Sequence, residues 1–93
     1  MASTHRVNRV RQMLLRELSD IVHRMRDPRV AMVTVVDTEV SRDLKFATMF
    51  ISAVGDAAAQ EAAVKALESA LGHIRRELAQ RIQLRHVPEL HVQ

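Results

Sequence analysis

The stretch ESALGHIRREL, residues 68–78, decides how the second half of this chain folds. Its apolar residues recur at the three- and four-residue spacings of a helix, yet Gly72 stands near its middle. A glycine inside a helix costs about 1 kcal/mol relative to alanine, and the whole chain contains only two glycines. The helix therefore either runs straight through Gly72 or bends there.

The helical pattern extends well beyond this stretch. It begins after Asp56, a good helix cap, and continues from Ala57 to about residue 82. A straight helix of this span would be about 39 Å long, whereas a compact domain of this size has a diameter of roughly 32 Å. A bend near Gly72 would let both halves pack on one sheet, and glycine is common at sharp helix bends. The alternative is a straight helix in which Gly72 allows close packing against the sheet.

Two short apolar segments before this helix predict a hairpin. Residues 31–40, AMVTVVDTEV, and residues 45–52, KFATMFIS, are rich in β-branched residues and too short to favour a helix. The polar connection SRDL, residues 41–44, joins them as two paired strands. One face of the second strand would carry Ala47, Met49 and Ile51, and the other Phe46, Thr48 and Phe50. We expect both phenylalanines to lie in the core, which argues against a base-stacking platform on the sheet.

A helix is also predicted at the start of the chain, with Ser3 or Thr4 as its cap and Asp27-Pro28 as its end. One side of it is apolar, and the other carries Arg6, Arg9, Arg16, His23 and Arg24. At the opposite end of the chain, ELHVQ, residues 89–93, begins like a third strand that looks cut short. Residues 1–93 thus predict one domain of α+β class with the order α-β-β-α-α-β.

Charge is distributed unevenly along the chain, which contains twelve arginines but only two lysines. Residues 1–30 carry a net charge of +4, residues 31–70 of −3 and residues 71–93 of +2. Two basic ends around an acidic middle indicate a basic face for a polyanion such as RNA. The alternative is an arginine-rich solvated surface, or codon bias in the source genome.

The sequence offers little support for an enzyme, a metal site or a membrane protein. Cysteine is absent, and no segment resembles a signal peptide or a membrane span, so we expect a cytoplasmic protein without cofactor. The five histidines form no metal-binding motif. Asp37, Glu39 and Asp43 lie within seven residues, but no nucleophile or phosphate-binding loop accompanies them. These carboxylates are therefore better interpreted as solvent-facing charges of the hairpin than as the catalytic groups of a small hydrolase.

Four stretches together resemble the bacterial ribosome-binding factor A family, over about Val7 to Val92. They are MRDPRVAMVTVVDTEVSRDLKFATMFISAVGD at 25–56, ALG at 70–72, IRREL at 74–78 and RHVPELHV at 85–92. The resemblance implies a type II KH-like domain, α-β-β-α-kink-α-β, with its helices on one face of a three-stranded sheet. KH domains usually clamp nucleic acid with a GxxG loop. The family has an Ala-x-Gly kink instead, here Ala70-Leu71-Gly72, so Gly72 would form the bend.

The resemblance also implies a function. The family binds the free small (30S) ribosomal subunit, assists late maturation of 16S rRNA including its 5′ end, and is linked to growth in the cold. The partner would be 16S rRNA within the free subunit, bound by a monomer. The family often carries a flexible tail, which would be missing after Gln93. In the alternative, the domain binds a ribosomal protein or an assembly GTPase without touching RNA.

The candidate RNA-binding residues are basic or lie at the kink. Arg75 and Arg76 lead, because they follow a helix start that would attract phosphate. The others are Arg6, Arg9, Arg16, Arg42, Lys45, Ala70, Gly72, His73, Arg81 and Arg85. Four of these have alternatives, since Arg85 could pair with an acidic hairpin residue, and each of Arg6, Arg9 and Arg16 on the first helix could be merely solvated. Arg11 lies nearer the apolar stripe, and its side chain could simply lie along the surface instead of contacting RNA. Asp27-Pro28-Arg29 is most simply interpreted as a helix stop.

Overall fold

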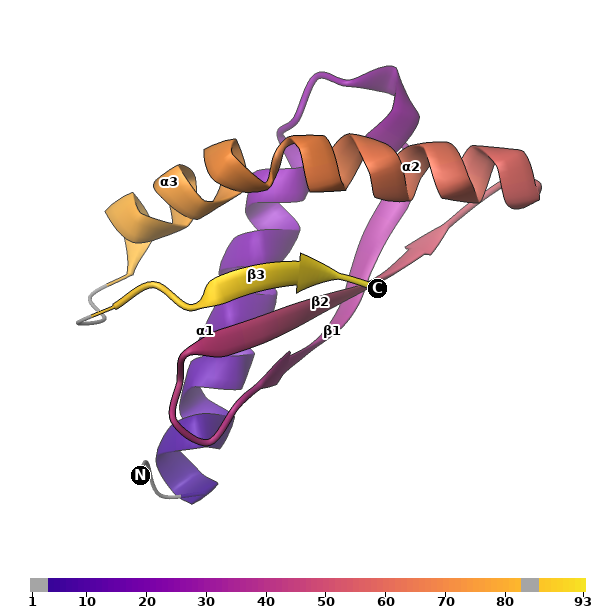
Figure 1. Cartoon of the computed structure of the whole chain (residues 1–93). Coiled ribbons are helices and arrows are strands. Elements are labelled where there is room, and N and C mark those ends of the chain that lie inside the picture. Colours follow the sequence, from indigo (N-terminus) through magenta and orange to yellow (C-terminus); the bar gives the residue numbers. More distant parts are fainter. Residues whose placement is uncertain (1–3, 83–85) are drawn as a thin grey trace.

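The computed structural model describes residues 4–82 and 86–93, and its elements follow the predicted order (Figure 1). They are α1 (Thr4–His23), a short 3₁₀ turn (Pro28–Val30), β1 (Val33–Val40), β2 (Phe46–Ala53), α2 (Ala57–Ser69), α3 (Leu71–Arg81) and β3 (Glu89–Val92). The strands form one sheet in the order β1-β2-β3. The predicted hairpin pairs β1 and β2 antiparallel, and β3 joins the other side of β2 in parallel.

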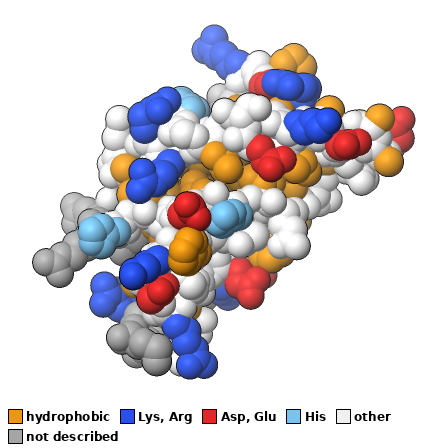
Figure 2. Space-filling view, in the orientation of Figure 1, with side chains coloured by type: hydrophobic (Ala, Val, Ile, Leu, Met, Phe, Trp, Pro, Cys, Tyr) orange, Lys and Arg blue, Asp and Glu red, His pale blue; other side chains and the backbone are white. Residues whose placement is uncertain are grey.

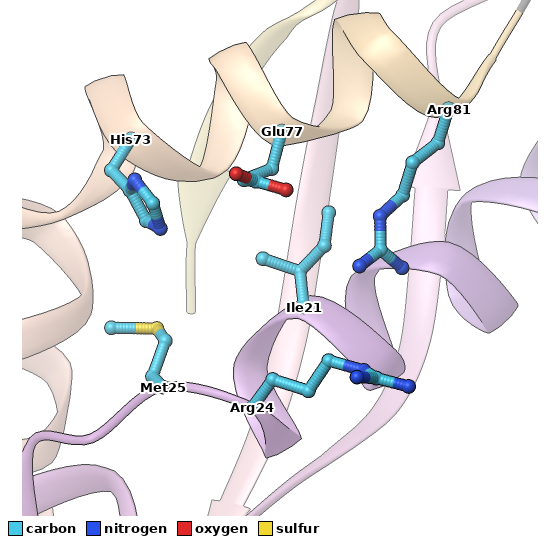
Figure 3. Close-up of a pocket in the computed structure, with 6 residues that line it drawn as sticks. All are labelled: Ile21, Arg24, Met25, His73, Glu77 and Arg81. Atoms are coloured by element: carbon cyan, nitrogen blue, oxygen red, sulfur yellow. The ribbon is translucent and has the colours of Figure 1, made fainter.

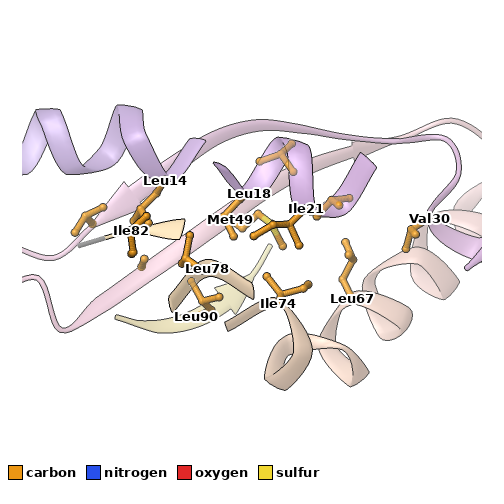
Figure 4. Close-up of a cluster of buried hydrophobic side chains, with 14 of the residues drawn as sticks. Leu14, Leu18, Ile21, Val30, Met49, Leu67, Ile74, Leu78, Ile82 and Leu90 are labelled. Carbon is orange, nitrogen blue, oxygen red and sulfur yellow. The ribbon is translucent and has the colours of Figure 1, made fainter. Parts of the chain in front are cut away.

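All three helices cover one face of the sheet, as predicted. Figure 1 shows α1 behind the strands and α2 followed by α3 along one side. Their apolar stripes meet the inward-facing side chains of the strands in a single core (Figure 4). Its most deeply buried large side chains include Leu14, Leu18, Met49, Leu67, Ile74 and Leu78. Because α1, α2 and α3 share this core, their relative positions are fixed by the packing of apolar side chains.

The sheet contains an irregularity that the alternating pattern did not predict. The register of β1 against β2 shifts between Val35 and Asp37, which inserts one extra residue. The bulge lets Val35 and Thr38, three residues apart, both face the core. The buried Thr38 hydroxyl donates to the backbone oxygen of Arg11 at 2.7 Å, so its polar group is satisfied where β1 meets α1.

Both phenylalanines were predicted to be core residues, and this prediction is wrong. Phe46 is 49% exposed and Phe50 is half-buried, whereas Ala47 and Met49 between them are buried. Side chains alternate between the two faces along β2. Ala47 and Met49 point toward the helices, so Phe46 and Phe50 point to the face that none of these helices covers. The only two aromatic side chains of the chain thus lie on the uncovered face of the sheet.

Short side-chain contacts set the ends of several elements. Asp56 caps α2 as predicted, because its carboxylate accepts the Ala59 N–H at 2.9 Å. Asp43 stabilises the hairpin turn by accepting the Ser41 hydroxyl and the Lys45 N–H. The structure ends α1 at His23, earlier than the predicted stop at Asp27. Asp27 instead caps the 3₁₀ turn and accepts the Arg29 N–H at 2.9 Å.

The long helix does break within the predicted Ala70-Leu71-Gly72 kink, and the residue that leaves the helix is Ala70 rather than Gly72. Ala70 leaves the helical conformation, with φ −97° and ψ 3°, and α3 starts again at Leu71. Gly72 therefore lies inside the first turn of α3. The length argument also fails, because the molecule is 40 Å long in its largest dimension and could hold a straight helix. The break follows instead from the packing of α2 and α3 on one core, which contains both Leu67 and Ile74.

Replacing Gly72 with alanine should stabilise the fold by about 0.5–1 kcal/mol, because alanine favours the helix more strongly than glycine. Space is available, since an added Cβ would approach only the Arg76 Nη1 atom, at 3.6 Å. Urea unfolding of Gly72→Ala and the unmodified chain measures the difference. A loss of stability would show that the α3 backbone requires glycine at this position.

Candidate nucleic-acid interface

A groove between α1 and α3 is the main feature around the predicted kink residues. It has a volume of about 190 Å³ and is lined by Ile21, Arg24, Met25, His73, Glu77 and Arg81 (Figure 3). The start of α3 lies beside the end of α1, with His73 pointing toward Met25. We call this feature the α1–α3 groove. It brings the kink into the neighbourhood of Arg24, which the sequence analysis did not select.

Asp20 holds the far end of the α1–α3 groove together. Its Oδ2 atom accepts from Arg81 Nη1 at 2.6 Å and from Arg24 Nε at 3.0 Å. Hydrogen bonds from Arg81 and then from Arg24 lower the pKa of the Asp20 carboxyl. Arg81 also reaches Glu17 at 3.5 Å, and its side chain is only 26% exposed. Arg81 is a candidate for RNA contact, and in this structure its guanidinium also ties α3 to α1.

Acid should destabilise this protein through three carboxyl groups with lowered pKa values. The groups are Asp20, held by Arg81 and Arg24, Asp27, held by Arg29, and Asp43, held by Ser41 and the Lys45 N–H. A lowered pKa means that the folded chain keeps these carboxylates ionised where the unfolded chain binds protons. Their contribution is therefore complete above the unfolded value, about 3.9, and is lost as the pH falls through the folded values.

Thermal unfolding between pH 2 and pH 7 tests this pH dependence. We expect a plateau near neutrality and a decline below about pH 4, because the unfolded chain then binds more protons. Asp20→Asn should reduce the size of this decline and also lower the plateau, because it weakens the contacts of Arg81 and Arg24. An unfolding temperature that stays constant down to pH 2 would contradict the account.

The first turns of α3 carry the leading candidates in exposed positions. Gly72, His73, Arg75 and Arg76 are all exposed. The helix cap, Ala70, has no side-chain group that could bond the first N–H groups of α3. Arg76 extends next to Gly72. Arg75 has a structural contact as well, because its Nη2 atom donates to the Val87 oxygen at 3.2 Å and holds the segment before β3.

The remaining candidates lie elsewhere and do not join one surface. Arg6 and Arg9 are exposed on the first turns of α1, and Arg42 and Lys45 are exposed at the hairpin turn. Figure 1 places this turn beside the amino-terminal part of α1. Arg16 lies on a different side of α1, where it lines a hollow with Val33 and Thr34 near β1. Arg85 lies outside the described residues.

Two further arginines are accounted for by ion pairs. Arg11 was expected to extend along the surface, and its Nη1 atom bonds Asp37 at 2.7 Å. Arg29 returns to Asp27, with Nη2 to Oδ2 at 2.7 Å, so the DPR segment forms its own closed contact. This agrees with its interpretation as a local structural element. The missed Arg24 could be found only from the fold, because its neighbours on α3 are distant in sequence.

Within residues 4–82 and 86–93, no group of three or more histidine, aspartate or glutamate side chains is arranged to hold a metal ion. Asp37 and Asp43, considered for acid–base chemistry, are engaged separately by Arg11 and by the hairpin turn. Among the described residues, no helix is both long and apolar enough to span a membrane.

Comparison with known proteins identifies the family. Residues 6–93 match the family described as ribosome-binding factor A. The crystal structure of ribosome-binding factor A from Thermus thermophilus is similar, with a TM-score of 0.86 and 25% identity over 94% of this chain and 92% of that chain. A solution structure from Thermotoga maritima, of a protein proposed to be a ribosome-binding factor A, is also similar. Its TM-score is 0.85 and its sequence identity is 25%, over 100% of this chain and 90% of that chain.

A further match is a homology model of Thermus thermophilus ribosome-binding factor A, fitted into an electron cryo-microscopy map of its complex with the 30S subunit. It has a TM-score of 0.75 and 27% identity, over 88% of this chain and 87% of that chain. The family match covers nearly the whole described fold, including the kink and both basic ends. This chain therefore belongs to the ribosome-binding factor A family.

Proposed function

We propose that this protein is a non-enzymatic assembly factor that binds the free 30S subunit and assists late maturation of 16S rRNA, including processing of its 5′ end. The family assignment and the 30S complex of the similar Thermus thermophilus protein support this proposal. The protein acts in the cytoplasm as a monomer, and a role in adaptation to cold belongs to the same proposal.

The observation that carries the proposal is the exposed start of α3. His73, Arg75 and Arg76 are exposed in the first turns of α3, which has no side-chain cap, and Gly72 adds no side chain over the backbone there. Helix N-terminal N–H groups and the helix dipole favour a phosphate, and arginine binds phosphate in a bidentate manner. In a KH-like fold this turn would correspond to the loop with which KH domains hold the nucleic-acid backbone. The backbone of 16S rRNA is the ligand that fits this chemistry.

Two other groups of candidates would extend the contact. Arg24, directly after α1, lines the α1–α3 groove together with His73 of α3. Arg6 and Arg9 on the first turns of α1, and Arg42 and Lys45 at the hairpin turn, are exposed and would supply separate basic contacts. Binding that is tighter to one rRNA conformation than to another shifts the population toward the favoured conformation. The protein would hold the rRNA in the favoured conformation until maturation is complete.

Sedimentation with purified free 30S subunits tests the proposal. At low salt the protein should travel with the subunits, and it should be released at high salt because phosphate contacts displace counterions. Joined ribosomes serve as the comparison and should carry little of the protein. Failure to sediment with free subunits at any salt concentration would contradict the proposed function.

A further inference from the structure

The uncovered face of the sheet has a composition unlike the rest of the surface. We define the open face by its outward residues Asp37, Glu39, Phe46, Phe50, Glu89 and His91. The three strands contain no lysine or arginine, although the chain has fourteen such residues. Figure 2 shows hydrophobic, acidic and histidine side chains mixed over β2 and β3, with most of the blue basic groups over the helices and the hairpin turn. The molecule therefore has two chemically different sides.

The strand register places one carboxylate opposite each ring. Phe46 is opposite Glu89 on β3, and Phe50 is opposite Asp37 on β1. Glu39 lies opposite Thr48, at the centre of the middle strand. His91 adds a ring 6.3 Å from that of Phe46 and contacts Glu89 at 3.1 Å. An apolar centre with acidic margins is complementary to a partner that has both cationic and apolar groups.

A hollow at the β1 margin of the open face shows what such a surface accepts. It has a volume of about 490 Å³ and is lined by Arg11, Asp37, Thr38, Glu39 and Phe50. The Asp37 carboxylate is already paired with the Arg11 guanidinium. Glu39 makes no ion pair with any described residue, and it is exposed beside the Phe50 ring. A carboxylate next to an aromatic face suits a lysine or arginine side chain, through an ion pair and a cation–π contact.

We propose that the open face docks a cationic, extended polypeptide segment of a protein partner while the helices contact rRNA. Basic side chains of the segment would bind Glu39 and Glu89, and its apolar groups would cover Phe46 and Phe50. Aromatic residues on a sheet can also stack RNA bases, but Glu39 and Glu89 would repel the phosphates that accompany those bases. This inference adds a protein contact to the proposed function and does not depend on RNA binding.

A peptide titration followed by amide NMR tests the inference directly. The probe is a twelve-residue peptide alternating arginine or lysine with valine, compared with a glutamate version and a twelve-nucleotide oligouridylate. The basic peptide should shift the amides of Thr48, Phe50 and His91, whereas the acidic peptide should not. Shifts of these amides by the oligouridylate instead, or no saturable shift by the basic peptide, would overturn the proposal.

Charge variants make the peptide test specific. Glu39→Lys with Glu89→Lys should weaken binding of the basic peptide at least about tenfold, because attraction becomes repulsion. Glu61→Lys with Glu68→Lys, two exposed positions on α2, makes the same charge change away from the sheet and should leave binding within about twofold. Equal losses in both pairs would mean that the peptide responds only to net charge, which would overturn a defined site.

Cross-linking on the 30S subunit tests the same surface with natural partners. The chain has no cysteine, so a single cysteine at Thr48 or at the exposed Ala79 of α3 can carry a photoreactive group. Position 48 should cross-link to protein and position 79 to rRNA. An rRNA product from position 48 would overturn the inference. If neither variant binds subunits, the proposed function fails, and the peptide titration still decides the role of the open face.

Discussion

Charge reversal at Arg75 and Arg76 should weaken binding to free 30S subunits at least about tenfold, since it removes two phosphate contacts and adds two repulsive charges. Both side chains are exposed in the first turns of α3, beside the uncovered backbone of Gly72. The slope of the logarithm of the binding constant against the logarithm of salt concentration should fall in magnitude by about 1.4 to 1.8 units. Equilibrium binding of labelled protein at several salt concentrations measures both quantities.

Two controls separate RNA contact from other effects of Arg75→Glu with Arg76→Glu. Arg75 also bonds the Val87 oxygen, so circular dichroism and thermal unfolding must first establish that the double variant is folded. Lys65→Glu reverses a charge on α2 that is 71% exposed and is not a candidate for RNA contact, and it should change affinity less than about threefold. Unchanged subunit binding in a folded double variant would exclude the start of α3 as the RNA contact.

The largest effect on stability should come from Leu78→Ala, at about 3 kcal/mol of unfolding free energy. Leu78 is fully buried, on α3, in the core shared with α1 and β3. Truncation removes apolar contacts and leaves a cavity that the sheet and α1 cannot readily fill. For a domain of this size the unfolding temperature should fall by about 12–24 °C, a large share of a total stability of about 5–15 kcal/mol.

Urea and thermal unfolding measure the effect of Leu78→Ala. Val54→Ala is the matched control, because Val54 is 69% exposed and its truncation should cost less than about 0.5 kcal/mol. A loss below about 1 kcal/mol for Leu78→Ala would mean that α3 is not held by this core. The position of the kink and of Arg76 would then lack the support that the fold gives them.

Local sequence patterns predicted the positions of the helices and strands well, because short-range signals determine these elements. The stripes of the helices, the short β-branched segments and the Asp56 cap each depend on a few neighbouring residues. The bulge at Val35–Asp37 had no such signal, since it reflects how β1 meets α1 and β2. The exposed phenylalanines were missed for a related reason. Alternation divides the residues of β2 into two faces but does not state which face the helices cover.

The sequence suggested which residues to examine for RNA contact, but how these residues lie relative to one another depends on the fold. Arginine excess and the kink region indicated RNA, but the pairing of Arg81 with Asp20 depends on residues 61 positions apart. Arg24 and His73 line the same groove only because the fold brings the end of α1 beside the start of α3. The break at Ala70 rather than Gly72 also changes the role of the glycine. The backbone of Gly72 is helical, and because Gly72 has no side chain it leaves the start of α3 uncovered.

A structure of this protein bound to the free 30S subunit, determined by electron cryo-microscopy, tests the central claim most directly. The account predicts that 16S rRNA phosphates lie against the start of α3, within hydrogen-bonding distance of Arg75 or Arg76 and of the backbone at Gly72. It also predicts that the open face, with Phe46 and Phe50, is turned away from the rRNA. A complex in which the open face lies on rRNA and the start of α3 faces solvent would contradict the account.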